Sequence, residues 1–293
     1  MILVVGSTGT VGQQVVQLLV ARGHRVRALV RTGSNRAKVE PLEKAGIMLF
    51  AGDLKDAASI RAACAGVETV VSTASASISR GEGDTIQSVD RDGQLGLVDA
   101  AKDAGVRHFI YVSFSGNIDA PFPLRDAKRA VERRLEQSGM AFTVLRPSFF
   151  MDVWLSPHAG FDPVGGQVRI YGTGDALVSM ICASDVAAYA AACVGNPAVL
   201  NQVIELGGPE PVTCNAVVRL FETALGRSVE RTHVPEAALE ERLAASDDPL
   251  QKTLAGLALC MARGDAIDNA MALAMADVPL TTVRAFIDRR VRI

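Results

Sequence analysis

Three glycines near the start of the chain, Gly6, Gly9 and Gly12, are spaced three residues apart. They follow the short apolar run Ile2–Val5, and a helix-like stretch over residues 11–22 comes next. In a corner of this kind the glycines permit a tight turn, close backbone approach to a phosphate and close packing of helix on strand. Unpaired N–H groups at the helix start then face the anion. The pattern predicts a dinucleotide-binding corner rather than a plain glycine-rich turn, and its residues are Gly6, Thr8, Gly9, Thr10, Val11 and Gly12.

The second predicted strand, residues 25–30, ends at Arg31. An NAD-specific fold offers an acidic residue near this point to the ribose 2′-hydroxyl. A guanidinium instead pairs with a 2′-phosphate through two parallel hydrogen bonds. We therefore expect NADP(H) as the cofactor, with no carboxylate competing for Arg31. The alternative is a solvated surface arginine.

Two further strand ends carry candidate cofactor contacts. Asp53 and Leu54 follow the predicted strand 47–51. Asp53 either bonds the adenine edge, with Leu54 beside the ring, or is an ordinary turn aspartate. Thr73 and Ala74 follow the next strand, where their small side chains either let the cofactor cross the sheet or are plain loop residues.

Lys128 lies within a predicted helix over residues 124–138. A lysine here is either solvated or bonds the nicotinamide ribose and places positive charge near a reacting proton. We predict the second role, so Lys128 counts as both a catalytic and a cofactor-binding residue.

Aromatic residues gather after the sixth predicted strand, residues 142–145. Phe149, Phe150 and Trp154, the only tryptophan, follow Pro147 in a chain that is only 5% aromatic. They form either the wall of an apolar substrate pocket or ordinary core. We predict the pocket.

Strands and helices alternate up to about residue 147, which predicts an α/β fold with a doubly wound parallel sheet of the Rossmann type. Ligands of such sheets bind beyond the carboxyl ends of the strands. We expect an NAD(P)-binding domain over residues 1–150. Residues 151–293 are expected to form a smaller, mostly helical C-terminal substrate lobe that is not an independent domain.

Composition narrows the classes of function. The chain has 293 residues, 49% of them hydrophobic, and a net charge of −2, which argues against nucleic-acid binding. The five cysteines lack C-x-x-C spacing and the four histidines lack metal-ligand spacing, so we expect reduced thiols, a cytoplasmic location and no metal. We expect no signal peptide, because the chain starts directly with the first strand, and no membrane span.

Several motifs in order resemble the NmrA-like, atypical short-chain dehydrogenase/reductase family, and the resemblance covers nearly the whole chain. They are the glycine triplet, Leu29-Val30-Arg31, Gly52-Asp53-Leu54, Asp99-Ala100-Ala101 with Gly105-Val106, Leu145-Arg146-Pro147, Gly207-Gly208-Pro209-Glu210 and Pro279-Leu280-Thr281-Thr282-Val283.

The resemblance also implies roles for single residues. Ser115 falls nearest the family's catalytic serine, with Ser113 as runner-up and substrate contact; a plain backbone-bonding serine is the alternative. Pro147 and Phe149 resemble the nicotinamide-side turn. The family's usual Tyr-x-x-x-Lys pair is broken, because Leu124 stands in the tyrosine position.

The family includes NADPH-dependent quinone, phenylpropanoid and dye reductases, redox-sensing regulators and photosystem-assembly factors. The sequence therefore predicts an NADPH-dependent oxidoreductase that reduces a small apolar quinonoid or conjugated substrate, with a homodimer as a further expectation. The alternative is a non-catalytic NAD(P)-sensing regulator or an assembly factor.

Overall fold

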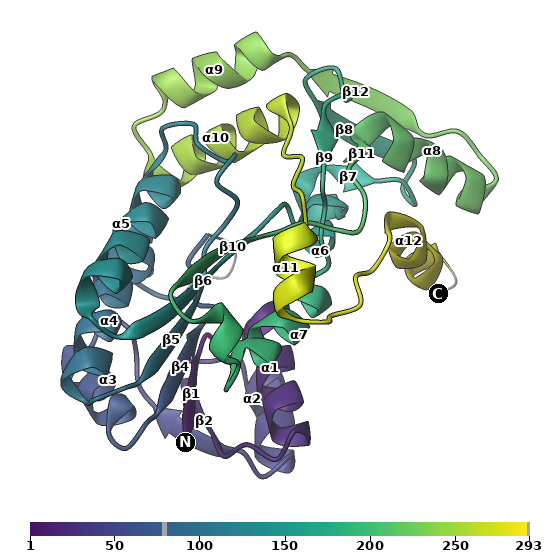
Figure 1. The fold of residues 1–293 in the computed structure, drawn as a ribbon. Helices are drawn as coiled ribbons and strands as arrows, with labels where there is room; N and C mark the ends of the chain where they lie inside the picture. Colours follow the sequence, from purple (N-terminus) through teal and green to yellow (C-terminus); the bar gives the residue numbers. More distant parts are fainter. Residues whose placement is uncertain (78–80, 292–293) are drawn as a thin grey trace. The chain divides into compact units, whose positions relative to one another are not determined.

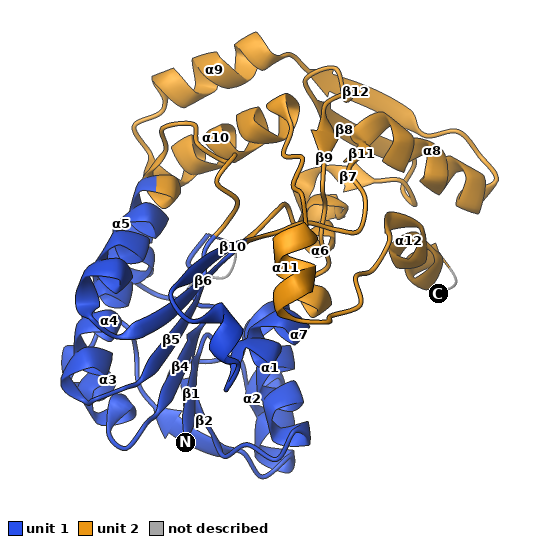
Figure 2. Ribbon diagram, in the orientation of Figure 1, with its two compact units in different colours: residues 1–113, 126–145, 187–204 blue, residues 114–125, 146–186, 205–293 orange. Residues whose placement is uncertain are grey.

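The computed structural model of the protein describes residues 1–77 and 81–291. The chain forms two compact units, each built from several chain segments (Figure 2). Unit 1 comprises residues 1–113, 126–145 and 187–204, and unit 2 comprises residues 114–125, 146–186 and 205–293.

A seven-stranded sheet in the order β10-β6-β5-β4-β1-β2-β3 belongs to unit 1 except for the last two residues of β6 and of β10 (Figure 1). The neighbouring strands from β3 to β6 pair in parallel. This arrangement confirms the predicted α/β fold with a doubly wound sheet. The strands are β1 (Ile2–Val5), β2 (Val26–Val30), β3 (Met48–Ala51), β4 (Thr69–Ser72), β5 (His108–Val112), β6 (Ala141–Pro147) and β10 (Gln202–Leu206).

The order of the strands reverses between β1 and β4. From β1 the chain adds β2 and β3 on one side, and β4 then pairs with the other side of β1. Ligands of open α/β sheets bind at such a switch point, outside the carboxyl ends of the strands. The glycine corner follows β1 directly and therefore lies at this point.

Helices cover both faces of the sheet (Figure 1). On one face, α3, α4 and α5 pack against buried side chains of β1, β4, β5 and β6 and form a hydrophobic core with them. Strands of a parallel sheet are buried on both faces, so their side chains are apolar along the whole strand. On the other face lie α1 and α2. The helices with residues in unit 1 are α1 (Thr10–Ala21), α2 (Arg36–Lys44), α3 (Ala57–Cys64), α4 (Gln94–Asp103), α5 (Pro123–Ser138) and α7 (Ala183–Cys193).

The segment before β5 differs from expectation. The apolar spacing of Leu95, Leu97, Val98 and Ala101 predicts a single helix over residues 89–105. In the structure a π-helical segment, Ile86–Gly93, comes first and α4 continues from it. Thr85 and Ser88 cap its start through reciprocal hydrogen bonds between side chain and backbone. Val89 therefore lies inside the π-helical segment rather than at a helix start.

Unit 2 has two small sheets of its own within the described residues, β12-β8-β7 and β11-β9. Its remaining elements are mostly helical, as predicted. Throughout the described ranges, no helix has both the length and the apolar character needed to cross a membrane. The elements of unit 2 are β7 (Phe161–Asp162), β8 (Gln167–Tyr171), β9 (Leu177–Val178), β11 (Val212–Thr213), β12 (Glu230–Val234), α6 (Met151–Trp154), α8 (Cys214–Leu225), α9 (Glu236–Ala245), α10 (Pro249–Arg263), α11 (Ala270–Met275) and α12 (Val283–Val291).

Candidate functional site

A cavity of about 590 Å³ opens in unit 1 at the carboxyl ends of β1 to β4; we call it the charged cavity. Pockets for small molecules and cofactors typically have volumes in this range. Its lining brings together eight of the predicted cofactor contacts: Gly6, Thr8, Gly9, Arg31, Asp53, Leu54, Thr73 and Ala74.

The glycines of the corner serve two different purposes. A Cβ on Gly12 would lie 2.1 Å from the Gly6 carbonyl oxygen, and one on Gly6 would lie 2.7 Å from the Ala74 nitrogen. Both positions therefore need glycine for the fold itself. A Cβ on Gly9 would meet only the Gly6 oxygen, at 3.2 Å, so the fold leaves space in front of Gly9. Gly9 is the position where the sequence predicts close approach of a pyrophosphate to the backbone.

Helix α1 begins beside this space. Gly9 is its N-cap residue, with extended backbone, and no side chain among the described residues caps the helix start. The first N–H groups of a helix have no partner within the helix. The predicted contacts Thr10, Val11 and Gly12 form this first turn, so their backbone groups suit a pyrophosphate better than their side chains do.

Arg31 lies in the wall of the charged cavity, but one expectation about it is wrong. A carboxylate does compete for this guanidinium: Asp84 accepts a hydrogen bond from Arg31 Nη1 and another from Lys55 Nζ. Burial alone would raise the pKa of Asp84, but hydrogen bonds from Lys55, Gly81 and Arg31 hold this pKa below its ordinary value. Asp84 stands 53 residues after Arg31, and the loop that carries it folds back onto the end of β2.

Asp53 is a turn aspartate that also lines the charged cavity, and its predicted adenine contact stays a prediction. One carboxylate oxygen accepts a hydrogen bond from the backbone N–H of Lys55 at 2.9 Å, which is the geometry of an Asx turn. The other lies 3.1 Å from Lys55 Nζ. Asp53 and Leu54 also line the charged cavity. Asp53 thus fixes the turn and remains exposed to a ligand.

Lys128 is buried beneath the carboxyl end of β5. Its Nζ donates a hydrogen bond to the Val112 carbonyl oxygen at 3.0 Å and lies 4.9 Å from the centre of the Tyr111 ring. Burial lowers the pKa of Lys128, although Asp90 and Glu132 oppose this shift. As far as the described residues show, the lining of the charged cavity does not include Lys128.

The two serines after β5 donate their hydroxyl protons to buried carboxylates. Ser113 donates to Glu132 Oε1 in unit 1, and Ser115 donates to Asp265 Oδ1 at 2.6 Å in unit 2. Asn117 also donates from its side chain to Asp265 Oδ1, at 3.0 Å. These contacts orient the hydroxyl groups and hold the loop after β5.

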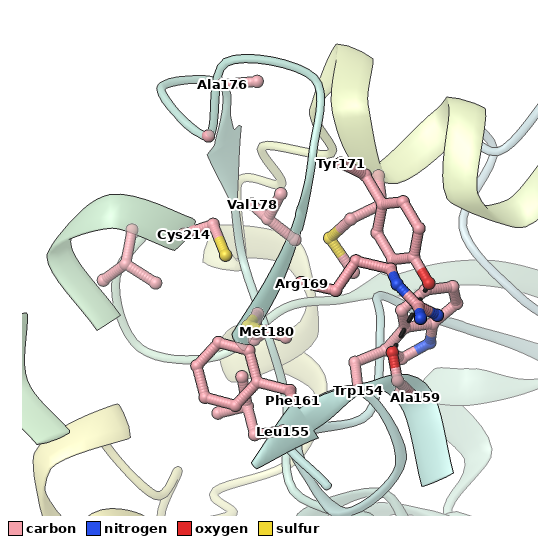
Figure 3. Close-up of a pocket in the computed structure, with 13 residues that line it drawn as sticks. Trp154, Leu155, Ala159, Phe161, Arg169, Tyr171, Ala176, Val178, Met180 and Cys214 are labelled. Carbon is pink, nitrogen blue, oxygen red and sulfur yellow. Dashed lines mark hydrogen bonds between the residues drawn. The ribbon is translucent and has the colours of Figure 1, made fainter. Parts of the chain in front are cut away.

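A second cavity lies within unit 2 and is lined mainly by apolar side chains; we call it the apolar cavity (Figure 3). Only about 30 Å³ of it admits a water-sized sphere, which is room for a few waters at most. Trp154 lines it and packs edge-on against Tyr171, with ring centres 5.9 Å apart. Tyr171 in turn donates a hydrogen bond to the Ala159 carbonyl oxygen at 3.4 Å.

The other aromatic residues of the predicted pocket, Phe149 and Phe150, are not part of the described lining of this cavity. Phe149 is buried and packs edge-on against Trp154, with ring centres 5.1 Å apart. Phe150 is the N-cap residue of α6, and Pro147 is buried and accepts a hydrogen bond from the Ser115 N–H. Of the aromatic cluster, the structure therefore brings only Trp154 to the apolar cavity.

Among the lining residues that sequence reasoning missed are Lys55 and Asp84, which form an ion-pair network with Arg31. Lys55 stands two residues after Asp53 and follows the same predicted strand, so the sequence could have indicated it as a candidate. The only local sign of Asp84 is the acidic, glycine-rich segment Gly81-Glu82-Gly83-Asp84.

Comparison with known proteins places this chain in a family. The chain matches the NmrA-like family over residues 1–287. It is 31% identical over 278 residues to the NAD(P)H azoreductase of Xenophilus azovorans, covering 94% of this chain and 88% of that protein. It is also 31% identical over 237 residues to the photosystem II assembly factor Ycf39 of Trieres chinensis, covering 80% of this chain and 72% of that protein. The crystal structure of the Escherichia coli NADPH-dependent quinone oxidoreductase QOR2 with NADPH is similar over 99% of both chains, with a TM-score of 0.80 and 25% identity.

Proposed function

The chain belongs to the NmrA-like family, and from this membership and the charged cavity of unit 1 we propose that it is an NADPH-dependent reductase. Its substrate is a small, apolar, quinonoid or conjugated molecule. The observation that carries the proposal is the space in front of Gly9, which lies in the same cavity as Arg31 and beside a helix start that no described side chain caps.

The residues of unit 1 divide the binding of NADPH between them. Backbone N–H groups of Thr10, Val11 and Gly12 bind the pyrophosphate. Arg31 binds the 2′-phosphate through the guanidinium nitrogens that Asp84 does not engage. Asp53 and Leu54 contact the adenosine end of NADPH. Thr73 and Ala74 lie beneath the cofactor where it crosses the sheet.

The catalytic roles rest on residues near the end of β5. When bound, the reduced nicotinamide supplies a hydride to the substrate. Lys128 holds positive charge near the ribose and stabilises the anion that develops on the substrate. Ser115 is the proposed catalytic serine, Ser113 and Phe150 are proposed substrate contacts, and Pro147 and Phe149 flank the nicotinamide. A water molecule or a further side chain supplies the proton.

The substrate class follows from relatives and from the aromatic residues of unit 2. Two relatives are named for azo and quinone reduction, and both substrate types are conjugated. Trp154 and Tyr171 offer flat apolar surfaces of the kind that such molecules contact. The apolar cavity has to enlarge by side-chain movement before it can hold one.

We also propose a cytoplasmic location and a homodimer. All five cysteines are free, and burial raises the pKa of the Cys64 and Cys182 thiols to about 11, so these thiols stay protonated and unreactive. Analytical ultracentrifugation checks the dimer: a single species of monomer mass at micromolar concentration contradicts it.

The function is tested by following oxidation of bound NADPH after mixing with a panel of quinones, azo dyes and enones. We expect at least one compound to oxidise the bound NADPH stoichiometrically, and omission of the compound is the control. Tight NADPH binding with no oxidation by any compound would contradict the reductase and favour a cofactor-sensing or assembly role. Absence of NADPH binding would contradict both the reductase and the cofactor-sensing role.

A further inference from the structure

One buried carboxylate bridges two cations in the wall of the charged cavity. Asp84 accepts from Arg31 Nη1 and the Gly81 N–H through Oδ2, and from Lys55 Nζ through Oδ1. Its side chain is only 2% exposed, whereas the Arg31 side chain is 36% exposed. Asp84 therefore lies on the inner side of the guanidinium and a ligand approaches from the outer side.

The loop that carries Asp84 also packs closely against the Arg31 guanidinium. A Cβ on Gly81 would lie 2.9 Å from Arg31 Nη1. Asp84 and the Gly81 backbone thus share one edge of Arg31, and the ion pair is part of the local packing. An incoming phosphate has to share Arg31 with a partner already in place.

The charges around the cavity balance. Among its described lining residues, the cations are Arg31, Lys38 and Lys55, and the carboxylates are Asp53, Glu82 and Asp84. A cavity wall without net positive charge attracts a dianionic 2′-phosphate less strongly than a wall with an unpaired arginine would.

Resting on the proposed NADPH site, we infer that Asp84 is an internal competitor of the 2′-phosphate for Arg31 and Lys55, and that it limits the preference for NADPH over NADH. The carboxylate satisfies both cations when no phosphate is present. It repels the phosphate when one binds, and NADH does not meet this repulsion because it ends in a hydroxyl at the same place. Asp84 is therefore a residue that determines specificity, although it does not itself bind the phosphate.

The test is the ratio of the NADH Kd to the NADPH Kd, measured by isothermal titration for the wild-type protein and for Asp84→Asn. Asparagine keeps the shape and can still accept from Gly81. We expect the ratio to rise about fivefold or more, as for removal of one nearby like charge at a partly buried site. Asp84→Ser also removes the charge, and it repeats the test should Asp84→Asn fold poorly.

Glu82→Gln is the matched control. Glu82 lies two residues away on the same cavity wall but is exposed, so solvent and salt screen its charge. We expect Glu82→Gln to change the ratio by less than about twofold. An equal rise in both variants would show general repulsion and overturn the competition for Arg31.

Other outcomes separate this inference from the proposed function. If both nucleotides bind and the ratio stays the same in Asp84→Asn, the inference alone is wrong. If the ratio falls, Asp84 positions Arg31 for the phosphate and the inference is likewise wrong. If the wild-type protein binds neither nucleotide, both the inference and the proposed function are overturned.

Discussion

The charged cavity and the apolar cavity are built by different means. The charged cavity of unit 1 has a volume of about 590 Å³ and is shaped by glycine backbone, a helix start and paired charges. The apolar cavity of unit 2 admits water-sized spheres in only about 30 Å³ and is shaped by side chains that pack on one another. A wall of backbone and ion pairs stays open without a ligand, whereas apolar side chains close over empty space. In the proposed function, the cofactor site is therefore preformed and the substrate site has to be opened.

The largest effect is expected from Gly9→Val, which tests whether backbone shape makes the charged cavity. The valine side chain enters the space proposed for the pyrophosphate, so we expect NADPH affinity to fall by about a hundredfold or more. The fold should survive, because the added Cβ meets only the Gly6 oxygen at 3.2 Å. Cofactor-induced thermal shift measures the binding.

Gly96→Val in α4 is the control for this change, because a Cβ at Gly96 meets nothing within 4 Å. Normal NADPH binding by Gly9→Val would show that the nucleotide lies elsewhere.

Lys128→Met separates catalysis from binding. Methionine keeps much of the buried volume and removes the charge, so we expect turnover to fall by about a hundredfold while the NADPH Kd changes by less than about threefold. Single-turnover oxidation of NADPH and a binding titration give the two numbers. Lys102→Met, at an exposed lysine of α4, should change neither. Equal losses of turnover and affinity would contradict a role in the transition state.

Arg31→Ala tests the charged wall directly. Loss of a charged hydrogen-bonding partner should weaken NADPH by about tenfold and leave NADH nearly unaffected. Arg36→Ala is the control, because Arg36 pairs with Glu43 and is absent from the cavity lining among the described residues. Competition titrations measure the affinity of each variant for both nucleotides. Equal wild-type affinities for NADH and NADPH would count against the 2′-phosphate site.

Trp154→Ala probes the apolar cavity, where a smaller effect is expected. If Trp154 contacts substrate, the KM of Trp154→Ala for a quinone should rise severalfold with an unchanged NADPH Kd. The KM of Trp154→Phe should stay close to the wild-type value. If Trp154 is only core, the variant should instead lose a few kcal/mol of unfolding free energy with an unchanged KM. Steady-state kinetics and thermal unfolding distinguish the two outcomes.

The parts that could be predicted from the sequence are those encoded locally. The glycine corner occupies residues 6–12 and follows a strand whose four residues are all buried. Its shape therefore depends on residues that are consecutive in the sequence. The parallel sheet follows from the regular alternation of apolar runs and helical stretches. Helix α2 was missed because Pro41 interrupts its pattern, and β12 because four of its five residues are exposed.

The contacts that could not be predicted join distant residues. Asp84 meets Arg31 across 53 positions, and Ser115 meets Asp265 across 150. Both pairs depend on how loops return to the sheet, which no periodic pattern specifies. The sequence therefore singled out Arg31 and Ser115 as candidates and did not predict the carboxylates that accept hydrogen bonds from them.

A crystal structure of the protein with NADPH tests the central claim most directly. We predict that the pyrophosphate lies against Gly9 and the first N–H groups of α1, and that the 2′-phosphate contacts Arg31 on the side opposite Asp84. NADPH bound outside the charged cavity, or a 2′-phosphate turned away from Arg31, would contradict the account.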